Sequence, residues 1–155
     1  MKKTKKNQFA VIGGAGFLGS YIVKELIKQK YSVKIIDKTK TDNKNSYICD
    51  IMDYEKLKKL LSDCDYVFNF AGVADIGESN INPLETIKSN IIGSTNIFDI
   101  CAKLKIKRIF FASTLYVYSN SGGFYKTTKQ SLENILETYS KNFNLKYTVL
   151  RYGSI

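Results

Sequence analysis

The sequence contains no histidine and no tryptophan, a single proline and only three cysteines in 155 residues. Without histidine, Ser-His-Asp and Cys-His triads, H-E-x-x-H metal sites and a histidine general base are all excluded. Cys49, Cys64 and Cys101 are odd in number and lack C-x-x-C spacing, which argues against a disulfide framework or a zinc site and favours buried, reduced thiols. Any chemistry must therefore use Tyr, Lys, Ser, Thr, carboxylates or a cofactor.

Long hydrophobic runs are also missing, because no apolar stretch approaches the roughly 20 residues that a membrane-spanning helix needs. The basic N-terminal segment, 1–7, is followed by an apolar stretch that is short and ends at Gly13, so we do not expect a signal peptide. The hydrophobic fraction of 44% and the charged fraction of 25% fit one globular domain over 8–155 rather than a disordered chain. We expect a cytoplasmic protein with no membrane partner.

Acidic residues are scarce: 14 Asp and Glu stand against 24 Lys and Arg, which gives a net charge of +10. Such a balance raises the question of nucleic-acid binding. However, only Arg108 and Arg151 are arginines, and the lysines are scattered, with Lys56, Lys58 and Lys59 on an expected exposed helix face. A compositional bias toward Lys explains this charge more simply than a phosphate-binding patch, so we expect no nucleic-acid partner.

Apolar runs that we expect to form strands alternate with helical patterns along the whole chain. The expected strands are 9–12, 32–36, 46–49, 66–70, 108–112 and 147–150. The expected helices are 16–30, 54–61, 84–104 and 124–143; Asp53 would cap the second, and Pro83 precedes the third. This alternation is typical of an α/β protein with a doubly wound parallel sheet of about six strands and helices on both faces.

A glycine-rich turn, 13–19, directly follows the first expected strand and opens the first expected helix. Gly13 permits a tight turn, Gly16 lets the backbone approach a pyrophosphate, and Gly19 lets the helix pack closely on the strand. The helix N-terminus, where Phe17 and Leu18 lie, offers free N–H groups to phosphates. The turn therefore predicts a Rossmann-type dinucleotide site, the alternative being a glycine-rich connector with no ligand.

Asp37 lies at the end of the second expected strand, 18 residues after Gly19. A carboxylate at this point can accept hydrogen bonds from both adenosine ribose hydroxyls and repels a 2′-phosphate. We therefore predict NAD rather than NADP as the cofactor. Lys38 and Lys40 lie close by and could accommodate a phosphate, and the alternative for Asp37 is a surface turn residue.

Further motifs follow the later expected strands in order. They are Asp50-Ile51 after the third strand, Asn69 to Gly72 after the fourth, Asn90 in the long helix, Ser113-Thr114 after the fifth, Tyr125-x-x-x-Lys129, and Leu150 to Tyr152 after the sixth. Together with the glycine turn, from Phe9 onward, these motifs resemble the extended branch of the short-chain dehydrogenase/reductase superfamily. That branch includes NAD-dependent nucleotide-sugar epimerases and dehydratases, which are oxidoreductases or isomerases by activity.

The resemblance implies a role for each matching residue. Asp50 and Ile51 would lie beside the adenine, and Ala71 and Gly72 would line the cofactor near its ribose and pyrophosphate. Asn90 would support the strand end and the cofactor pocket, unless it is a polar helix residue that bonds only locally.

Tyr125 and Lys129 also have a physical logic of their own, since side chains four residues apart share one face of a helix. The pKa of a free Tyr is near 10, and a neighbouring ammonium lowers it by favouring the phenolate. Lys129 could also bond the nicotinamide ribose. The resemblance matches Thr114 to a catalytic Ser or Thr that donates to the substrate oxygen. Tyr125 would then move the hydroxyl proton while hydride passes between substrate carbon and nicotinamide.

The resemblance covers 9–155 but not the portion in which extended enzymes bind substrate, so we expect a cofactor domain that stops before the substrate domain. The leading hypothesis is an NAD-dependent epimerase or dehydratase of a nucleotide-activated sugar; the alternative is a non-catalytic NAD-binding or interaction module. The two long helices could pair in a homodimer. Ile87, Ile91, Ile135 and Tyr139 would face the partner or, equally well, the chain's own sheet.

Overall fold

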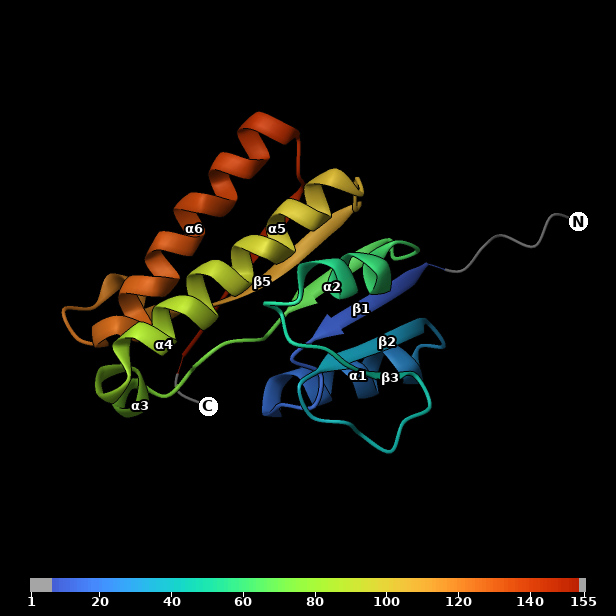
Figure 1. Ribbon diagram of the computed structural model, residues 1–155, viewed down its shortest axis with the longest axis horizontal. Helices are drawn as coiled ribbons and strands as arrows, with labels where there is room; N and C mark the ends of the chain where they lie inside the picture. Colours follow the sequence, from blue (N-terminus) through green and yellow to red (C-terminus); the bar gives the residue numbers. More distant parts are fainter. Residues whose placement is uncertain (1–6, 154–155) are drawn as a thin grey trace, which may run out of the picture.

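The computed structural model describes residues 7–153 and is built around one six-stranded parallel sheet. The strands are β1 (Gln8–Ile12), β2 (Ser32–Asp37), β3 (Ser46–Ile48), β4 (Tyr66–Asn69), β5 (Arg108–Thr114) and β6 (Tyr147–Tyr152). Their order is β3-β2-β1-β4-β5-β6 (Figure 1), so the chain winds outward from β1 to one edge and then from β4 to the other. This confirms the predicted α/β doubly wound sheet. Of the expected N-terminal segment 1–7, all but Asn7 lies outside the described residues.

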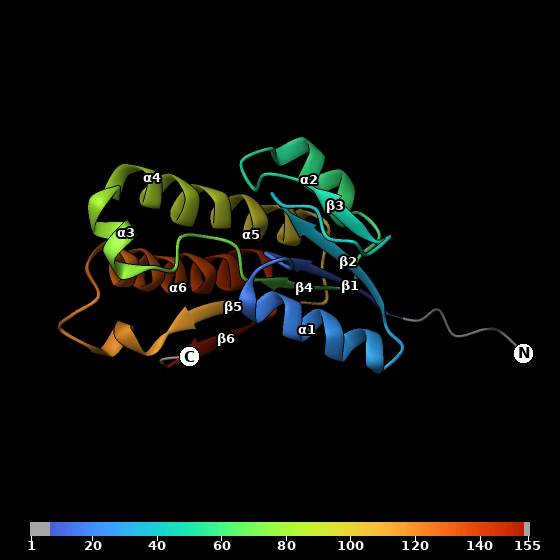
Figure 2. The ribbon, with the colours of Figure 1, turned by 90° about the horizontal axis from the view of Figure 1, so that it is seen from below.

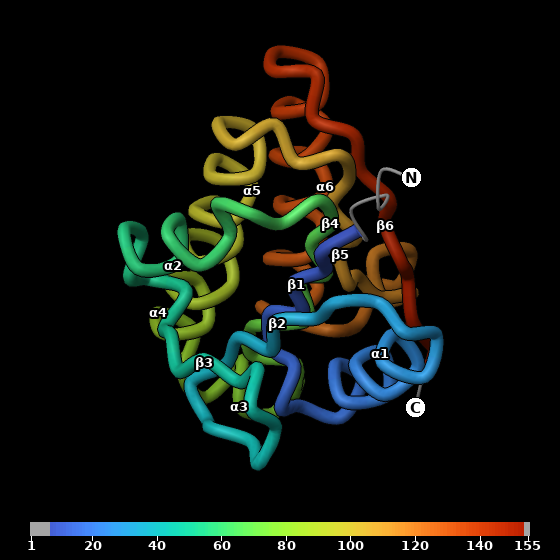
Figure 3. The backbone as a smooth tube through the Cα atoms, turned by 90° about the vertical axis from the view of Figure 1, so that its right-hand side faces the viewer, coloured from blue at the N-terminus to red at the C-terminus, as the bar shows by residue number. Residues whose placement is uncertain are grey.

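Helices cover both faces of the sheet, but unequally. They are α1 (Phe17–Lys28), α2 (Tyr54–Leu61), α3 (Ile76–Ile81), α4 (Pro83–Ile87), α5 (Ser94–Lys103) and α6 (Gly123–Phe143), with a π-helical turn η1 (Lys88–Gly93) and a 3₁₀ turn η2 (Leu115–Tyr118). Figures 2 and 3 show α1 alone on one side of the sheet, and α2, α5 and α6 on the other. Two buried clusters correspond to these two sides, a large one under α2, α5 and α6 and a small one under α1.

The sequence pattern accounts well for the regular elements. In α2, Asp53 caps the helix by accepting from the Lys56 N–H at 3.1 Å, as predicted. Leu57 and Leu61 of the same helix are buried, while Glu55, Lys56 and Lys59 are exposed. This amphipathic pattern fixes which side of α2 packs on the sheet.

The expected single helix 84–104 is wrong in detail, because α4, η1 and α5 divide it. Pro83 is the first residue of α4, where its missing N–H costs nothing. The π-helical turn lies at Lys88–Gly93, and its centre carries Asn90, whose side chain bonds to another segment. The helix α3 and the turn η2 were not predicted, since elements of six and four residues are too short to show periodicity.

The three thiols are free, with Cys49 and Cys101 buried and Cys64 partly buried. Burial raises the pKa of the Cys64 thiol to about 12, so this group is an unreactive thiol at neutral pH. Within residues 7–153 no helix combines the length and the apolar character needed to cross a membrane.

Candidate active site

Two adjoining cavities open at the carboxyl ends of the central strands. One, of about 370 Å³, is lined by the ends of β1 and β2 and by the segment after β4. The other, of about 440 Å³, is lined by the start of α1, the end of β5 and the first turns of α6. They share Gly13, Gly16, Phe70 and Gly72. This is where a doubly wound sheet binds its ligand, because the strand order reverses between β1 and β4.

The glycine turn lies between the two cavities, and its glycines differ in what they allow. A Cβ on Gly13, whose φ is +77°, would lie 2.7 Å from the Ala71 nitrogen. A Cβ on Gly19 would lie 2.2 Å from the Gly13 carbonyl oxygen, so helix and turn could not approach as they do. On Gly16 the nearest such atom is 3.3 Å away, which leaves space on the cavity side.

The N-terminus of α1 opens directly from this turn, and its cap residue Gly16 has no side chain to bond the first N–H groups. Phe17, Leu18 and Gly19 all line the second cavity. Amide donors and a positive helix end suit a pyrophosphate. The turn therefore fits the central part of a dinucleotide, which would extend from one cavity into the other.

The first cavity holds most of the residues predicted to contact adenosine. Asp37 lines it, and both of its carboxylate oxygens are fixed by backbone donors: Oδ2 accepts from the Ala15 N–H at 3.0 Å and Oδ1 from the Thr39 N–H at 3.1 Å. Ile51, Ala71 and Gly72 also line this cavity. The carboxylate is thus held beside the glycine turn, where a ribose would lie.

Asp50 does not line either cavity. Its carboxylate forms an ion pair with Lys38 at 3.2 Å and accepts from the Met52 N–H at 2.9 Å. That backbone hydrogen bond, together with Lys38, keeps the pKa of Asp50 below its ordinary value. Of the two lysines considered for a 2′-phosphate, Lys38 is thus paired with Asp50.

The second cavity brings together the three predicted catalytic residues, Thr114, Tyr125 and Lys129. Thr114 is the last residue of β5 and is buried, while Tyr125 and Lys129 lie one turn apart at the start of α6. Lys129 is 6% exposed, and its Nζ donates to the carbonyl oxygen of Ala112 at 2.9 Å. All three side chains thus converge on one hollow beside the glycine turn.

The expected effect of Lys129 on the phenol of Tyr125 is wrong for this structure. Burial raises the pKa of Tyr125, and a hydrogen bond with Thr114 partly opposes this rise. Lys129 is not among the groups that shift this pKa. The Lys129 Nζ lies 5.8 Å from the centre of the Tyr125 ring and is turned to Ala112 instead. Burial also lowers the pKa of Lys129 to about 8, so most of this side chain is neutral above that pH.

Asn90 lies behind the cavities rather than in their walls. Its Oδ1 accepts from the Val73 N–H at 2.7 Å, and its Nδ2 donates to the Val73 carbonyl oxygen at 3.0 Å and to the Thr128 Oγ1 at 3.0 Å. Asn90 is 1% exposed, so these bonds form in a dry environment. It therefore holds the backbone after Gly72 in place and ties it to α6, rather than bonding only within its own helix.

A network around Glu133 was missed by sequence reasoning. Its carboxylate accepts from the Ser113 hydroxyl at 2.6 Å and forms a bidentate pair with Arg151 at 3.0 and 2.7 Å. Arg151 and Ser113 outweigh the effect of burial and hold the pKa of Glu133 below its ordinary value. Glu133 follows Lys129 by one turn, and this spacing was the available signal. The network joins α6 to the ends of β5 and β6 beside Thr114.

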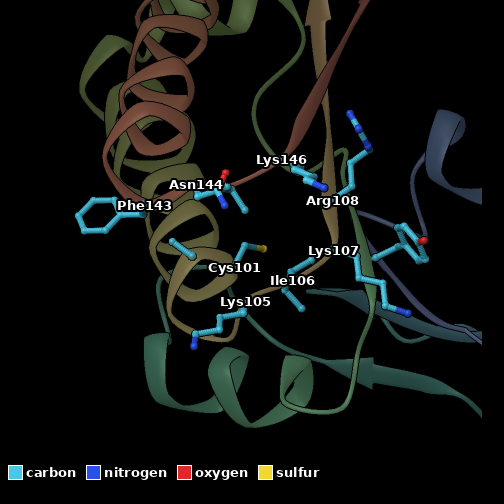
Figure 4. A pocket seen from close by; sticks show the side chains of 11 residues that line it. Cys101, Lys105, Ile106, Lys107, Arg108, Phe143, Asn144 and Lys146 are labelled. Carbon is cyan, nitrogen blue, oxygen red and sulfur yellow. The ribbon is translucent and has the colours of Figure 1, made fainter.

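A larger cavity, of about 720 Å³, lies at the opposite end of the sheet. Figure 4 shows its basic side chains, among them Lys105, Lys107 and Lys146, which extend in different directions rather than toward one point. They lie near the C-terminal ends of α5 and α6, where cations offset the negative ends of the helix dipoles. None of the predicted site residues lies there, so the two smaller cavities form the candidate site.

Comparison with known proteins agrees with this geometry. Residues 9–155 match the family described as the NAD dependent epimerase/dehydratase family. The chain belongs to this family. The predicted resemblance to NAD-dependent epimerases and dehydratases is thereby confirmed, and NAD is the cofactor of the family.

Among the similar proteins and solved structures, several are named UDP-glucose 4-epimerases. The chain is 29% identical over 167 residues to a putative UDP-glucose 4-epimerase of Methanocaldococcus jannaschii, covering 94% of this chain and 55% of that protein. It matches UDP-glucose 4-epimerase from Brucella ovis in complex with NAD at a TM-score of 0.89, with 27% identity over 96% of this chain and 52% of that one.

A third match is the UDP-glucose 4-epimerase of Thermotoga maritima with UDP-glucose, at a TM-score of 0.87 and 32% identity, covering 94% of this chain and 55% of that one. The chain therefore spans about half the length of the relatives it matches.

Proposed function

We propose that this chain is the cofactor-binding and catalytic part of an NAD-dependent epimerase that acts on a nucleotide-activated sugar, with UDP-hexoses as the first substrates to test. The observation that carries the proposal is the convergence of Thr114, Tyr125 and Lys129 on the cavity that begins at the glycine turn. The names of the similar proteins support the substrate class.

Each residue of the site is assigned a separate role in this reaction. NAD, held by the turn 13–19 and Asp37, supplies a hydride acceptor and donor next to the second cavity. Tyr125, once ionised to the phenolate, takes the proton of a substrate hydroxyl and later returns it. Thr114 donates a hydrogen bond to the same oxygen. Lys129, at a pKa of about 8, orients the nicotinamide side of the cofactor with its ammonium.

We further propose that the domain 8–155 pairs in a homodimer through its helical layer, beside α4 and η1. Of the four residues considered for this role, Ile91, Ile135 and Tyr139 are partly buried against the chain's own core. Ile87 is exposed, as are its apolar neighbours Leu84 and Ile92. These three exposed side chains are the surface that we assign to the second copy.

The function is tested by adding UDP-glucose to the chain saturated with NAD and following the absorbance of reduced nicotinamide. We expect a slow rise that is lost in Tyr125→Phe, because phenylalanine keeps the ring but has no phenolate oxygen to accept the proton. A chain that binds NAD but shows no substrate-dependent reduction would instead be the non-catalytic cofactor module. A rise that persists in Tyr125→Phe would remove Tyr125 from the proposed role.

A further inference from the structure

The helix α6, which carries Tyr125, begins without a capping side chain of its own. Its cap residue is Gly122, with φ +111°, and the next residue, Gly123, has φ +50°. The first N–H groups of a helix have no partner within the helix and need an acceptor from elsewhere. Here these N–H groups belong to the turn that holds the proposed proton acceptor.

The acceptors come from α3, more than 40 residues earlier in the chain. The hydroxyl of Ser79 accepts from the Tyr125 N–H at 3.2 Å and donates to the Ile76 carbonyl oxygen at 2.8 Å. The Oδ1 atom of Asn80 accepts from the Phe124 N–H at 3.3 Å. A Cβ on Gly123 would lie 2.1 Å from that Oδ1, so glycine is what lets Asn80 approach.

The same short helix also borders the cofactor side of the site. It follows directly on the segment 72–75, of which Gly72 and Ala74 line the second cavity, as does Ile76 at its own first turn. Asp75 caps α3 by accepting from the Glu78 N–H at 2.7 Å. One element thus contacts both the cavity wall and the backbone N–H of Tyr125.

We propose that α3 is the positioning element for Tyr125, with Ser79 and Asn80 acting as the N-terminal cap that α6 lacks. Ser79 is fully buried, so its hydroxyl has no competing water and holds one orientation. Asn80 is exposed and adds the second acceptor at the rim. The proposal rests on the proposed function in one respect, that Tyr125 is the residue whose position matters.

The exposed position offers a matched set of variants. Asn80→Ala removes the acceptor, whereas Asn80→Asp keeps an oxygen in its place and is itself a favourable cap residue. Glu78→Ala removes an exposed polar side chain from the same helix and serves as the control. Ser79→Ala removes the buried acceptor with little change in volume.

Amide exchange measured by NMR on the full chain tests the cap directly, and it requires neither cofactor nor substrate. We expect the Phe124 amide in Asn80→Ala and the Tyr125 amide in Ser79→Ala to exchange about fivefold faster, the effect of losing a typical cap. Asn80→Asp and Glu78→Ala should exchange at the wild-type rate.

A second readout reports on the side chain of Tyr125. Because burial raises the pKa of this phenol, loosening the first turn should hydrate it and bring the pKa down toward its ordinary value in Ser79→Ala and Asn80→Ala. Unchanged exchange in both alanine variants, or equal exchange in Asn80→Ala and Asn80→Asp, would overturn the proposal. Failure of the chain to reduce NAD would count against the proposed function, but the amide-exchange result would still test the cap, because that measurement needs neither cofactor nor substrate.

Discussion

Replacing Lys129 by Met is expected to make the folded chain more stable at neutral pH, by about 1 kcal/mol. Lys129 is nearly fully buried, and burial, the only resolved cause, brings its pKa from 10.5 to about 8. A shift of that size corresponds to roughly 3 kcal/mol of destabilisation by the buried charge. The lost hydrogen bond from the ammonium to the Ala112 carbonyl oxygen offsets about 2 kcal/mol of the gain.

The gain should depend on pH in a defined direction. Since the pKa of Lys129 is lower in the folded than in the unfolded chain, the folded state holds fewer protons between about pH 8 and 10.5. The buried charge therefore lowers the free energy of unfolding by its full amount below pH 8, and this effect disappears as the pH rises to 10.5. The advantage of Lys129→Met should shrink over the same interval.

Urea unfolding of both proteins at pH 7 and pH 10 measures this effect. Lys141→Met, at an exposed position of the same helix, is the control and should change the free energy of unfolding by less than about 0.5 kcal/mol. A destabilised Lys129→Met, or a gain that does not vary with pH, would mean that other contacts in the fold compensate the buried ammonium. A lysine whose replacement stabilises the fold is expected at a functional site, because activity rather than stability then determines which residue is present.

The glycine turn should separate folding from cofactor binding in two single substitutions. Gly19→Ala is expected to destabilise the chain by about 3 kcal/mol, because its Cβ would lie 2.2 Å from the Gly13 carbonyl oxygen and only backbone movement can relieve this. Gly16→Ala should cost less than about 1 kcal/mol, since its backbone is extended, with φ −73° and ψ 174°, and the nearest contact is 3.3 Å.

The affinity for NAD should change in a different order. In Gly16→Ala the methyl group stands where the pyrophosphate approaches, and we expect at least a tenfold loss of affinity, about 1.4 kcal/mol, in a chain that still folds. Thermal unfolding without ligand and calorimetric titration with NAD measure the two effects separately. Normal NAD affinity in Gly16→Ala would place the pyrophosphate somewhere other than the turn.

The sequence predicts well those features whose place in the fold follows from the residues next to them in the chain. Gly13 directly follows β1 and Gly72 comes three residues after β4, so both glycines lie at the carboxyl edge of the sheet and line the same cavity. Thr114 was predicted through the family resemblance, whereas the pairing of Tyr125 with Lys129 also follows from their four-residue spacing on one helix. Side chains that lie at strand ends or one helical turn apart are close in any doubly wound sheet.

Other features depend on contacts between distant segments and could not be predicted. The π-helical turn is centred on Asn90, whose partner Val73 is 17 residues away. The cap of α6 comes from Ser79, and nothing near Gly122 signals it. The direction of the Lys129 side chain depends on the Ala112 carbonyl oxygen, so the spacing from Tyr125 alone gave the wrong effect on the phenol.

Thermal unfolding of the chain in increasing NAD tests the central claim most directly, because a ligand that binds only the folded state must stabilise it. At about 100 times the dissociation constant we predict roughly 2.7 kcal/mol of stabilisation, or a rise in Tm of about 5–10 °C for a chain of this size. For a tenfold loss of affinity, the stabilisation of Gly16→Ala at the same concentration should be about half as large, roughly 1.4 kcal/mol. A Tm that does not move at any NAD concentration would contradict the assignment of the turn and its two cavities to a dinucleotide.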